Sequence, residues 1–432
     1  MLTAFYQAFR TPDLRKKLLF TLFIIVIFRL GASLPTPGVS VSAVKTCLAI
    51  KQTGILGLVN LLSGGALLKL TVFALGIMPY ITASIILQLL AVVIPRLETL
   101  RQEGASGTAK ITQYTRYLTI GLAILQSTAI VALAESGNLF GSACSAKLIP
   151  NTSVFTIATM VICLTAGTAV IMWLGELITD RGVGNGMSLM IFTQVIAVIP
   201  GQLYGILQSE GSVIFTMVLG VGVLIVAAVA FMEQAQRRIP VQYAKRMVGR
   251  KMYGGTSTYI PLKVNQAGVI PVIFASSLLS IPLLAANLFG TASTSGWSAW
   301  VQQRLAKQDD PYYMVGFFVL IILFTYFYVS ITFNPDEVAD NMKKSGGFIP
   351  GIRPGGPTAG YLRFVLNRLT APGSLYLGIV ALIPMLAIAL VHAGNQFPLG
   401  GTSIMIAVGV GLDTVKQIES QLQQRNYEGF LR

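Results

Sequence analysis

The sequence predicts an all-α polytopic membrane protein with ten transmembrane helices. Three observations lead to this fold class. Hydrophobic residues make up 54% of the 432 residues, charged residues make up only 11%, and the mean hydropathy is +0.71. A soluble domain carries about 25% charged residues, so too little polar surface is available here for a water-soluble body. The apolar runs, such as 218–232, are continuous, whereas strands of a membrane barrel alternate in polarity.

The individual spans follow from the length of these apolar runs. A spanning helix needs about 20 mostly apolar residues. The first run follows a basic segment and is not followed by a typical small-residue cleavage site, so we interpret it as a retained span. The ten predicted spans are 18–34, 71–94, 117–134, 154–174, 186–206, 213–232, 268–288, 312–333, 373–393 and 400–415.

The distribution of basic residues tests this arrangement. Ten spans place both termini on one side, and 24 of the 31 Lys and Arg residues fall on that side, against six on the other and Arg29 within the first span. Positive charge stays cytoplasmic, so we expect both termini in the cytoplasm. Two cytoplasmic loops, 233–267 and 334–372, are long and basic and contain Pro and Gly. They act either as topology determinants or, as we favour, as a docking surface for a cytosolic partner.

The segment between the first two spans is partly apolar. Residues 54–62 read GILGLVNLL, which is enough for two turns of helix but too short to span a bilayer. An apolar helix of this kind must be buried in protein or line a cavity. Two interpretations stay open: a re-entrant packing element, or a movable stopper in a pore.

Few residues favour catalysis, ion coupling or metal binding. Arg29 and Asp413 are the ionisable residues placed within spans, and an ion-coupled transporter would usually need more. His392 is the only histidine, and the sequence has neither an HExxH motif nor a Walker lysine motif. We therefore expect no enzyme, no cofactor and no metal site. Cys47 and Cys144 both fall outside, and whether they form a disulfide stays open.

Several long motifs resemble the SecY/Sec61-alpha family of protein-conducting channels, and their order along the chain agrees with that family. The resemblance runs over almost the whole chain and is strongest to bacterial, and among these actinobacterial, members. The motifs are 73–90 (FALGIMPYITASIILQLL), 173–188 (WLGELITDRGVGNGMS), 261–271 (PLKVNQAGVIP), 351–355 (GIRPG) and 63–66 (SGGA).

The resemblance implies a clamshell of two pseudo-symmetric five-helix halves, 1–206 and 207–432, with a short plug helix at about 53–65. It implies the channel subunit of the Sec translocon, which passes unfolded polypeptides across the membrane and releases hydrophobic segments sideways into lipid. An aliphatic constriction suits this task, because it blocks ions by dewetting and has no preference for substrate sequence. The implied pore ring comprises Ile77, Ile81, Met187, Ile191, Ile273 and Ile406. The implied plug residues are Gly54, Ile55, Leu56, Leu58, Asn60, Leu61, Gly64 and Gly65.

The family also implies a lateral gate between the second and third spans on one side and the seventh and eighth on the other. Its polar cluster matches Gln88, Gln126 and Asn265, whose mutual hydrogen bonds we expect to hold the gate shut. Docking of the SecA motor or the ribosome is implied for Arg250, Lys251, Lys343, Lys344 and Arg353.

The remaining expectations concern partners and location. The resemblance implies SecE and SecG-type small subunits, SecA, the ribosome, substrates bearing signal sequences, SecDF, YidC and anionic lipids, in the bacterial plasma membrane. Two other function classes are weighed against it. A small-solute secondary transporter needs charged ligands at a midplane site, and intramembrane charge is sparse here. An assembly scaffold or insertase would have no full aqueous path.

Overall fold

The computed structural model describes residues 9–48, 64–135, 148–243, 246–248, 251–253, 257–289, 296–305, 310–391 and 401–429, and helices dominate it. The helices of the first part are α2 (Pro12–Gly31), α3 (Val41–Leu48), α5 (Met78–Val93), α6 (Pro95–Gln102), α7 (Ala105–Glu135), α8 (Val154–Arg181) and α9 (Gly186–Gln234). Those of the second part are α10 (Ile270–Phe289), α11 (Trp297–Arg304), α12 (Pro311–Thr332), α13 (Pro335–Lys344), α14 (Gly356–Val391) and α15 (Gly401–Gly429).

The protein has several helices that can cross a membrane. Six described segments are long and apolar enough, or seven if the bent pair α5 and α6 counts as one. Non-helical backbone at Gly211 divides α9 into two of these segments, Gly186–Gln208 and Gly211–Gln234. Each of the ten predicted ranges overlaps a helix, but residues 71–77 lie in turns before α5, and α2, α10 and α15 are not among the six segments. In α2, the first turns also contain Arg15, Lys16 and Lys17. The chain is thus a multi-pass membrane protein.

The prediction of an all-α fold is wrong for the loop after the sixth span. Here β1 (Gln236–Tyr243) pairs antiparallel with β4 (Ser257–Lys263), and β5 (Gly347–Phe348) pairs with the other edge of β1. A second ladder joins β2 (Arg246–Val248) to β3 (Lys251–Tyr253). Proline is disfavoured in a paired strand, so Pro240 argues against a strand at this position. However, β5 pairs only with Gln242 and Tyr243, so the residue Pro240 lies where β1 has a free edge and a missing N–H is tolerated.

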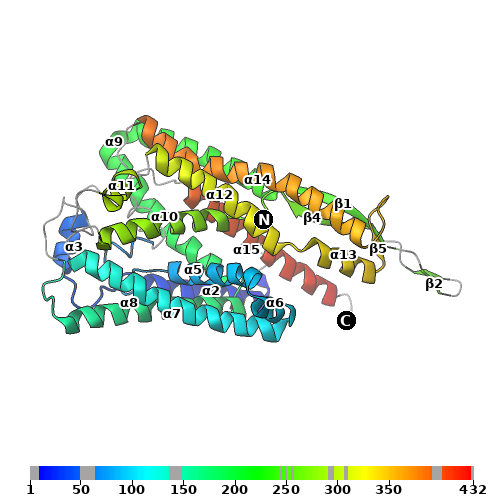
Figure 1. Ribbon diagram of the computed structural model, residues 1–432, viewed down its shortest axis with the longest axis horizontal. Coiled ribbons are helices and arrows are strands. Elements are labelled where there is room, and N and C mark those ends of the chain that lie inside the picture. Colours follow the sequence, from blue (N-terminus) through cyan, green and yellow to red (C-terminus); the bar gives the residue numbers. More distant parts are fainter. Residues whose placement is uncertain are drawn as a thin grey trace.

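The helices form two groups that follow the chain order (Figure 1). In this view α5, α7 and α8 lie on one side and α12 and α14 on the other, with α9 and α15 passing between them. The strands and α13 form a lobe at one end, which has its own apolar core around Ile239, Val241 and Leu262. At the opposite end, Cys47 takes part in a disulfide bond whose partner lies outside the described residues.

Candidate functional site

An apolar cluster, which we call the central cluster, joins the two groups of helices. It contains all six residues of the predicted ring, drawn from four helices: Ile77 and Ile81 at the start of α5, Met187 and Ile191 on α9, Ile273 on α10, and Ile406 on α15. Ile77, Ile191, Ile273 and Ile406 are buried, and Ile81 and Met187 are half-buried. The structure therefore brings residues separated by more than 300 positions into one apolar cluster.

Local backbone chemistry fixes Met187 at the start of α9. Asn185 caps α9, because its side-chain oxygen accepts hydrogen bonds from the backbone N–H groups of Met187 (3.1 Å) and Ser188 (3.3 Å). Gly186 lies against α8 so closely that a Cβ atom there would be 1.8 Å from the carbonyl oxygen of Gly175. Only glycine fits this approach, and it delivers Met187 into the central cluster.

The predicted plug is only partly within the described residues. Gly54, Ile55, Leu56, Leu58, Asn60 and Leu61 lie outside them. Gly64 has a φ of 70°, and a Cβ atom on it would lie 3.2 Å from Cα of Gln194 on α9. This turn therefore packs directly against α9, one helical turn beyond the ring residue Ile191. Gln194 is 0% exposed, and within the described parts of the chain its amide nitrogen and oxygen have no hydrogen-bond partner.

The structure does not assemble the predicted polar cluster of the gate. Gln88 is exposed on α5 and donates to Ser84 of its own helix (3.5 Å), and Gln126 is half-buried on α7. Asn265 is 3% exposed and donates its side-chain amide to the carboxylate of Glu233 and to the carbonyl of Gly268 (3.3 Å). The expected hydrogen bonds among the three amides are absent from these described residues. A carboxylate is a stronger acceptor than an amide, which explains the pairing of Asn265 with Glu233.

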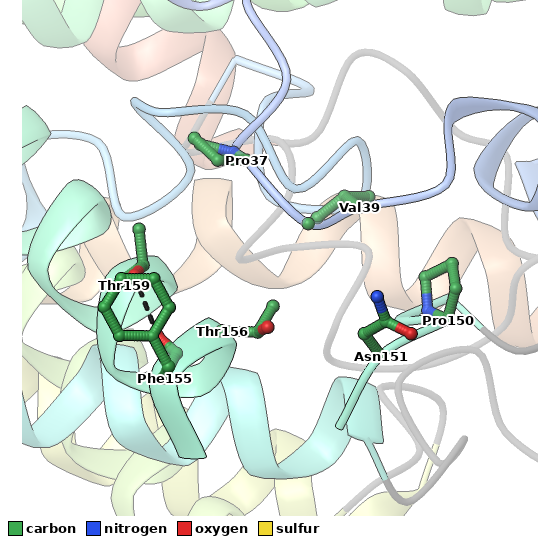
Figure 2. Close-up of a pocket in the computed structure, with 8 residues that line it drawn as sticks. Pro37, Val39, Pro150, Asn151, Phe155, Thr156 and Thr159 are labelled. Atoms are coloured by element: carbon green, nitrogen blue, oxygen red, sulfur yellow. Dashed lines mark hydrogen bonds between the residues drawn. The ribbon is translucent and has the colours of Figure 1, made fainter. Parts of the chain in front are cut away.

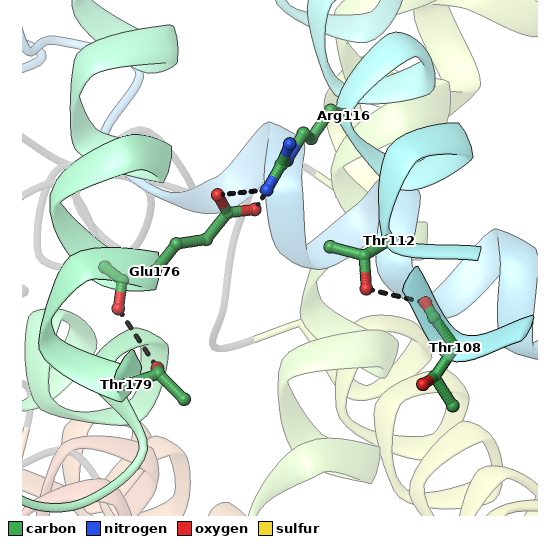
Figure 3. Close-up of polar contacts among 6 residues, drawn as sticks. Thr108, Thr112, Arg116, Glu176 and Thr179 are labelled. Atoms are coloured by element: carbon green, nitrogen blue, oxygen red, sulfur yellow. Dashed lines mark hydrogen bonds and ion pairs between the residues drawn. The ribbon is translucent and has the colours of Figure 1, made fainter. Parts of the chain in front are cut away.

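A bidentate ion pair connects α7 to α8 (Figure 3). The Nε and Nη2 atoms of Arg116 donate to the two carboxylate oxygens of Glu176 at 2.9 and 2.8 Å. Arg116 is 48% and Glu176 19% exposed, so the pair is half-solvated. Such a pair fixes the geometry between two helices but contributes little free energy. In the second group of helices, Lys263 pairs with Asp413 of α15 at 3.1 Å.

The predicted docking residues lie on the lobe that contains the strands. Lys343 and Lys344 are exposed in the last turn of α13, and Arg353 is exposed in the turn between β5 and α14. The turn is compact, since the carbonyl of Arg353 accepts from the Thr358 hydroxyl at 2.8 Å. Lys251 begins β3, whereas Arg250 and the side chain of Lys251 lie outside the described residues.

Comparison with known sequences decides the family. A profile of the SecY family matches residues 71–415. The protein translocase subunit SecY of Streptomyces galbus is 65% identical over 440 aligned positions, which cover 100% of both chains. That of Mycobacterium tuberculosis H37Rv is 59% identical over 442 positions, again over 100% of both chains. The chain belongs to the SecY family.

Solved structures share the fold. A protein conducting channel aligns with a TM-score of 0.64 at 18% identity, over 94% of this chain and 91% of that one. A SecY protein aligns with a TM-score of 0.63 at 19% identity, over 94% of this chain and 91% of that one. Its plug domain is described as stabilising the closed channel and maintaining a membrane seal. Sec61 in the canine ribosome-channel complex aligns with a TM-score of 0.61 at 18% identity, over 94% of this chain and 91% of that one. The predicted resemblance to this family is confirmed.

Two buried polar residues of this SecY-family chain escaped the sequence analysis. Gln194 shares the predicted fifth span, 186–206, with one other amide side chain, Gln202, and an amide within an apolar span is the signal that could have singled it out. Glu233 ends the sixth span, where a carboxylate is expected to face water, but it is only 8% exposed.

The described part of the chain also contains an outer cleft of about 440 Å³ (Figure 2). It lies between residues 37–39 and the start of α8, and it is lined by Pro37, Gly38, Val39, Pro150, Asn151, Phe155, Thr156 and Thr159. None of these is ionisable, and none is a predicted site residue. We assign no site to it.

Proposed function

We propose that this chain is the channel subunit of a bacterial protein translocase and that unfolded polypeptides pass through the central cluster. The observation that carries the proposal is the convergence of six aliphatic or thioether side chains from four helices. A constriction of this kind excludes water and ions when it is closed, and it offers no charge that would retain a polar chain. Membership of a family whose curated relatives are protein translocase subunits supports this function.

The two halves, 1–206 and 207–432, are proposed to open like a clamshell around the central cluster. Ile77, Ile81, Met187 and Ile191 come from the first half, and Ile273 and Ile406 come from the second. Separating the halves would therefore divide the ring. The break at Gly211 is close to the boundary and supports this division of ten spans into five and five. A hydrophobic segment would leave between α5 and α7 on one side and α10 and α12 on the other.

The plug is proposed to occupy the outer side of the ring. The turn at Gly64 and Gly65 packs on α9 beside Gln194, so it anchors the segment next to the ring. The related SecY protein with a plug domain supports this assignment. A Gly–Gly pair at this anchor has the backbone freedom to let the segment swing.

The basic lobe is proposed to bind the SecA motor or the ribosome through Lys343, Lys344 and Arg353. The ribosome-bound state of the related Sec61 complex supports the second partner. Guanidinium and ammonium groups suit both acidic protein surfaces and RNA phosphates. With this lobe and both termini cytoplasmic, the excess of basic residues obeys the positive-inside rule in a plasma membrane. SecE, SecG, SecDF, YidC and anionic lipids remain proposed partners from the family.

Single-channel conductance in planar bilayers tests the proposal. The intact translocase complex is compared with a variant that lacks 54–62, and with a control that lacks 249–254 at the tip of the cytoplasmic hairpin. We expect silence from the intact and control complexes and large currents from the plug deletion. Silence in all three, with folded and inserted protein, would contradict a plugged aqueous pore and favour the transporter or scaffold classes.

A further inference from the structure

The two halves meet almost entirely through apolar side chains. Among the hydrogen bonds between described residues, and apart from the backbone and side-chain bonds inside α9, one joins the halves. The Nη2 atom of Arg101 donates to the backbone carbonyl oxygen of Ile331 at 3.2 Å.

Both partners belong to segments that flank the gate. Arg101 is in the last turn of α6, the short helix that follows α5 after a bend of 104° and leads into α7. Ile331 is the penultimate residue of α12. Arg101 thus connects the segment between two gate helices of the first half to the cytoplasmic end of a gate helix of the second. Deeper in the gate, α7 contacts α10 directly.

The chemistry of a helix end explains why an arginine suits this position. The last four carbonyl groups of a helix have no partner within the helix. They also form the negative end of the helix dipole, which favours a cation. A guanidinium group offers five N–H donors and stays charged at any physiological pH. Arg101 therefore caps α12 from the opposite half, and opening the gate must remove this cap.

We propose that Arg101 is the polar latch of the lateral gate and that it sets how hydrophobic a signal segment must be to open the gate. The inference rests on the proposed channel function. The residue is exposed, so the latch is weak. Removing it should shift the balance toward the open gate by about two- to fivefold, the range for one exposed charge-assisted bond at a helix end. A weak latch can set a hydrophobicity threshold, because a strongly hydrophobic signal segment overcomes it and a weakly hydrophobic segment does not.

The test uses the reconstituted complex in proteoliposomes and a series of precursors whose signal segments decrease in hydrophobicity. Arg101→Gln removes the positive charge, and Arg101→Lys keeps the charge but lacks the planar guanidinium group. Arg96→Gln is the matched control, because Arg96 is exposed on the same helix and its side chain has no hydrogen bond or ion pair within the described residues. We expect Arg101→Gln to raise translocation of the weakest precursor about two- to fivefold. Translocation of the most hydrophobic precursor should be unchanged in Arg101→Gln. For the weakest precursor, translocation by Arg101→Lys should be intermediate, and translocation by Arg96→Gln should equal that by the parent protein.

The outcomes separate failure of the latch from failure of the channel function. If the parent complex does not translocate even the strongest precursor, the proposed function fails. If it does, and Arg101→Gln behaves like Arg96→Gln, the latch is refuted. A second measurement guards against a folding defect. Arg101→Cys and Ile331→Cys are combined in a Cys163→Ser background and joined by a short bifunctional thiol reagent, and release of a hydrophobic segment into lipid should stop. Release that continues in the cross-linked complex would also overturn the latch.

Discussion

Truncating one ring residue should unseal the closed channel. Ile406 on α15 is 1% exposed and belongs to the central cluster, whose other members come mainly from α2, α5, α8, α9 and α10. Ile406→Ala removes three carbon atoms. At about 0.8 kcal/mol per buried CH₂, the lost burial is about 2.4 kcal/mol. Core truncations of this kind cost about 2–5 kcal/mol when a cavity remains.

This cost falls on the closed state alone if opening separates the ring. The equilibrium between closed and open channels would then shift by about 50-fold, since each 1.4 kcal/mol is a factor of ten. Ile404 provides a matched control on the same helix. It is 2% exposed, but it belongs to a different cluster, built from α9, α10, α11, α12, α14 and α15. Ile404→Ala should destabilise the protein by a similar amount without favouring the open channel.

The assay is the open probability of single channels in planar bilayers, with thermal unfolding of the same complexes measured in parallel. We expect Ile406→Ala to raise the open probability and Ile404→Ala to leave it near that of the parent protein. An equal open probability for the two variants, at similar losses of thermal stability, would refute the assignment of the central cluster as the seal.

Three further predictions follow from close contacts and buried polar groups. Gly186→Ala should prevent stable folding, because the added Cβ would lie 1.8 Å from a carbonyl oxygen. The control Gly220→Ala, whose Cβ would have no neighbour within 4 Å, should be neutral or slightly stabilising. Similar melting temperatures for the two variants would contradict the close approach of α8 and α9. Asn265→Leu should lower the free energy of unfolding by about 3 kcal/mol, because it leaves the buried carboxylate of Glu233 without this partner. In a double-mutant cycle, the double variant Asn265→Leu, Glu233→Gln should recover part of that loss. Gln194→Met should stabilise the closed form by about 1–3 kcal/mol, since it removes a buried amide without partners among the described residues; a lower melting temperature would argue against this.

The helical part of the fold was predictable because its signals are local. An apolar run of about 20 residues is sufficient to place a helix, and every predicted range overlaps one, although α5 begins only at Met78 in the range 71–94. The ring depended on motif resemblance instead. Ile77 and Ile81 are four residues apart and share a helix face, but such pairs occur in any span. Only the fold brings Ile273 and Ile406 to them.

The parts that were missed depend on contacts between distant segments. Ile239 and Val241 are buried and alternate with exposed residues, a pattern that indicates a strand, but Pro240 between them argues against one. The pairing of Asn265 with Glu233 could not be predicted from the sequence. The carboxylate lies 32 positions away, at the start of the predicted cytoplasmic loop 233–267, and no sequence signal links it to Asn265. The contact between Arg101 and Ile331 involves a backbone acceptor, which has no sequence signal at all.

Cross-linking of a translocating chain tests the central claim most directly. A precursor is arrested in the reconstituted complex, with a photo-reactive amino acid placed at Ile191 in the ring or at Leu224, which is 70% exposed on the second half of α9. The account predicts adducts with the precursor from position 191 and adducts with lipid from position 224. Efficient arrest with no precursor adduct from position 191 would contradict a path through the central cluster.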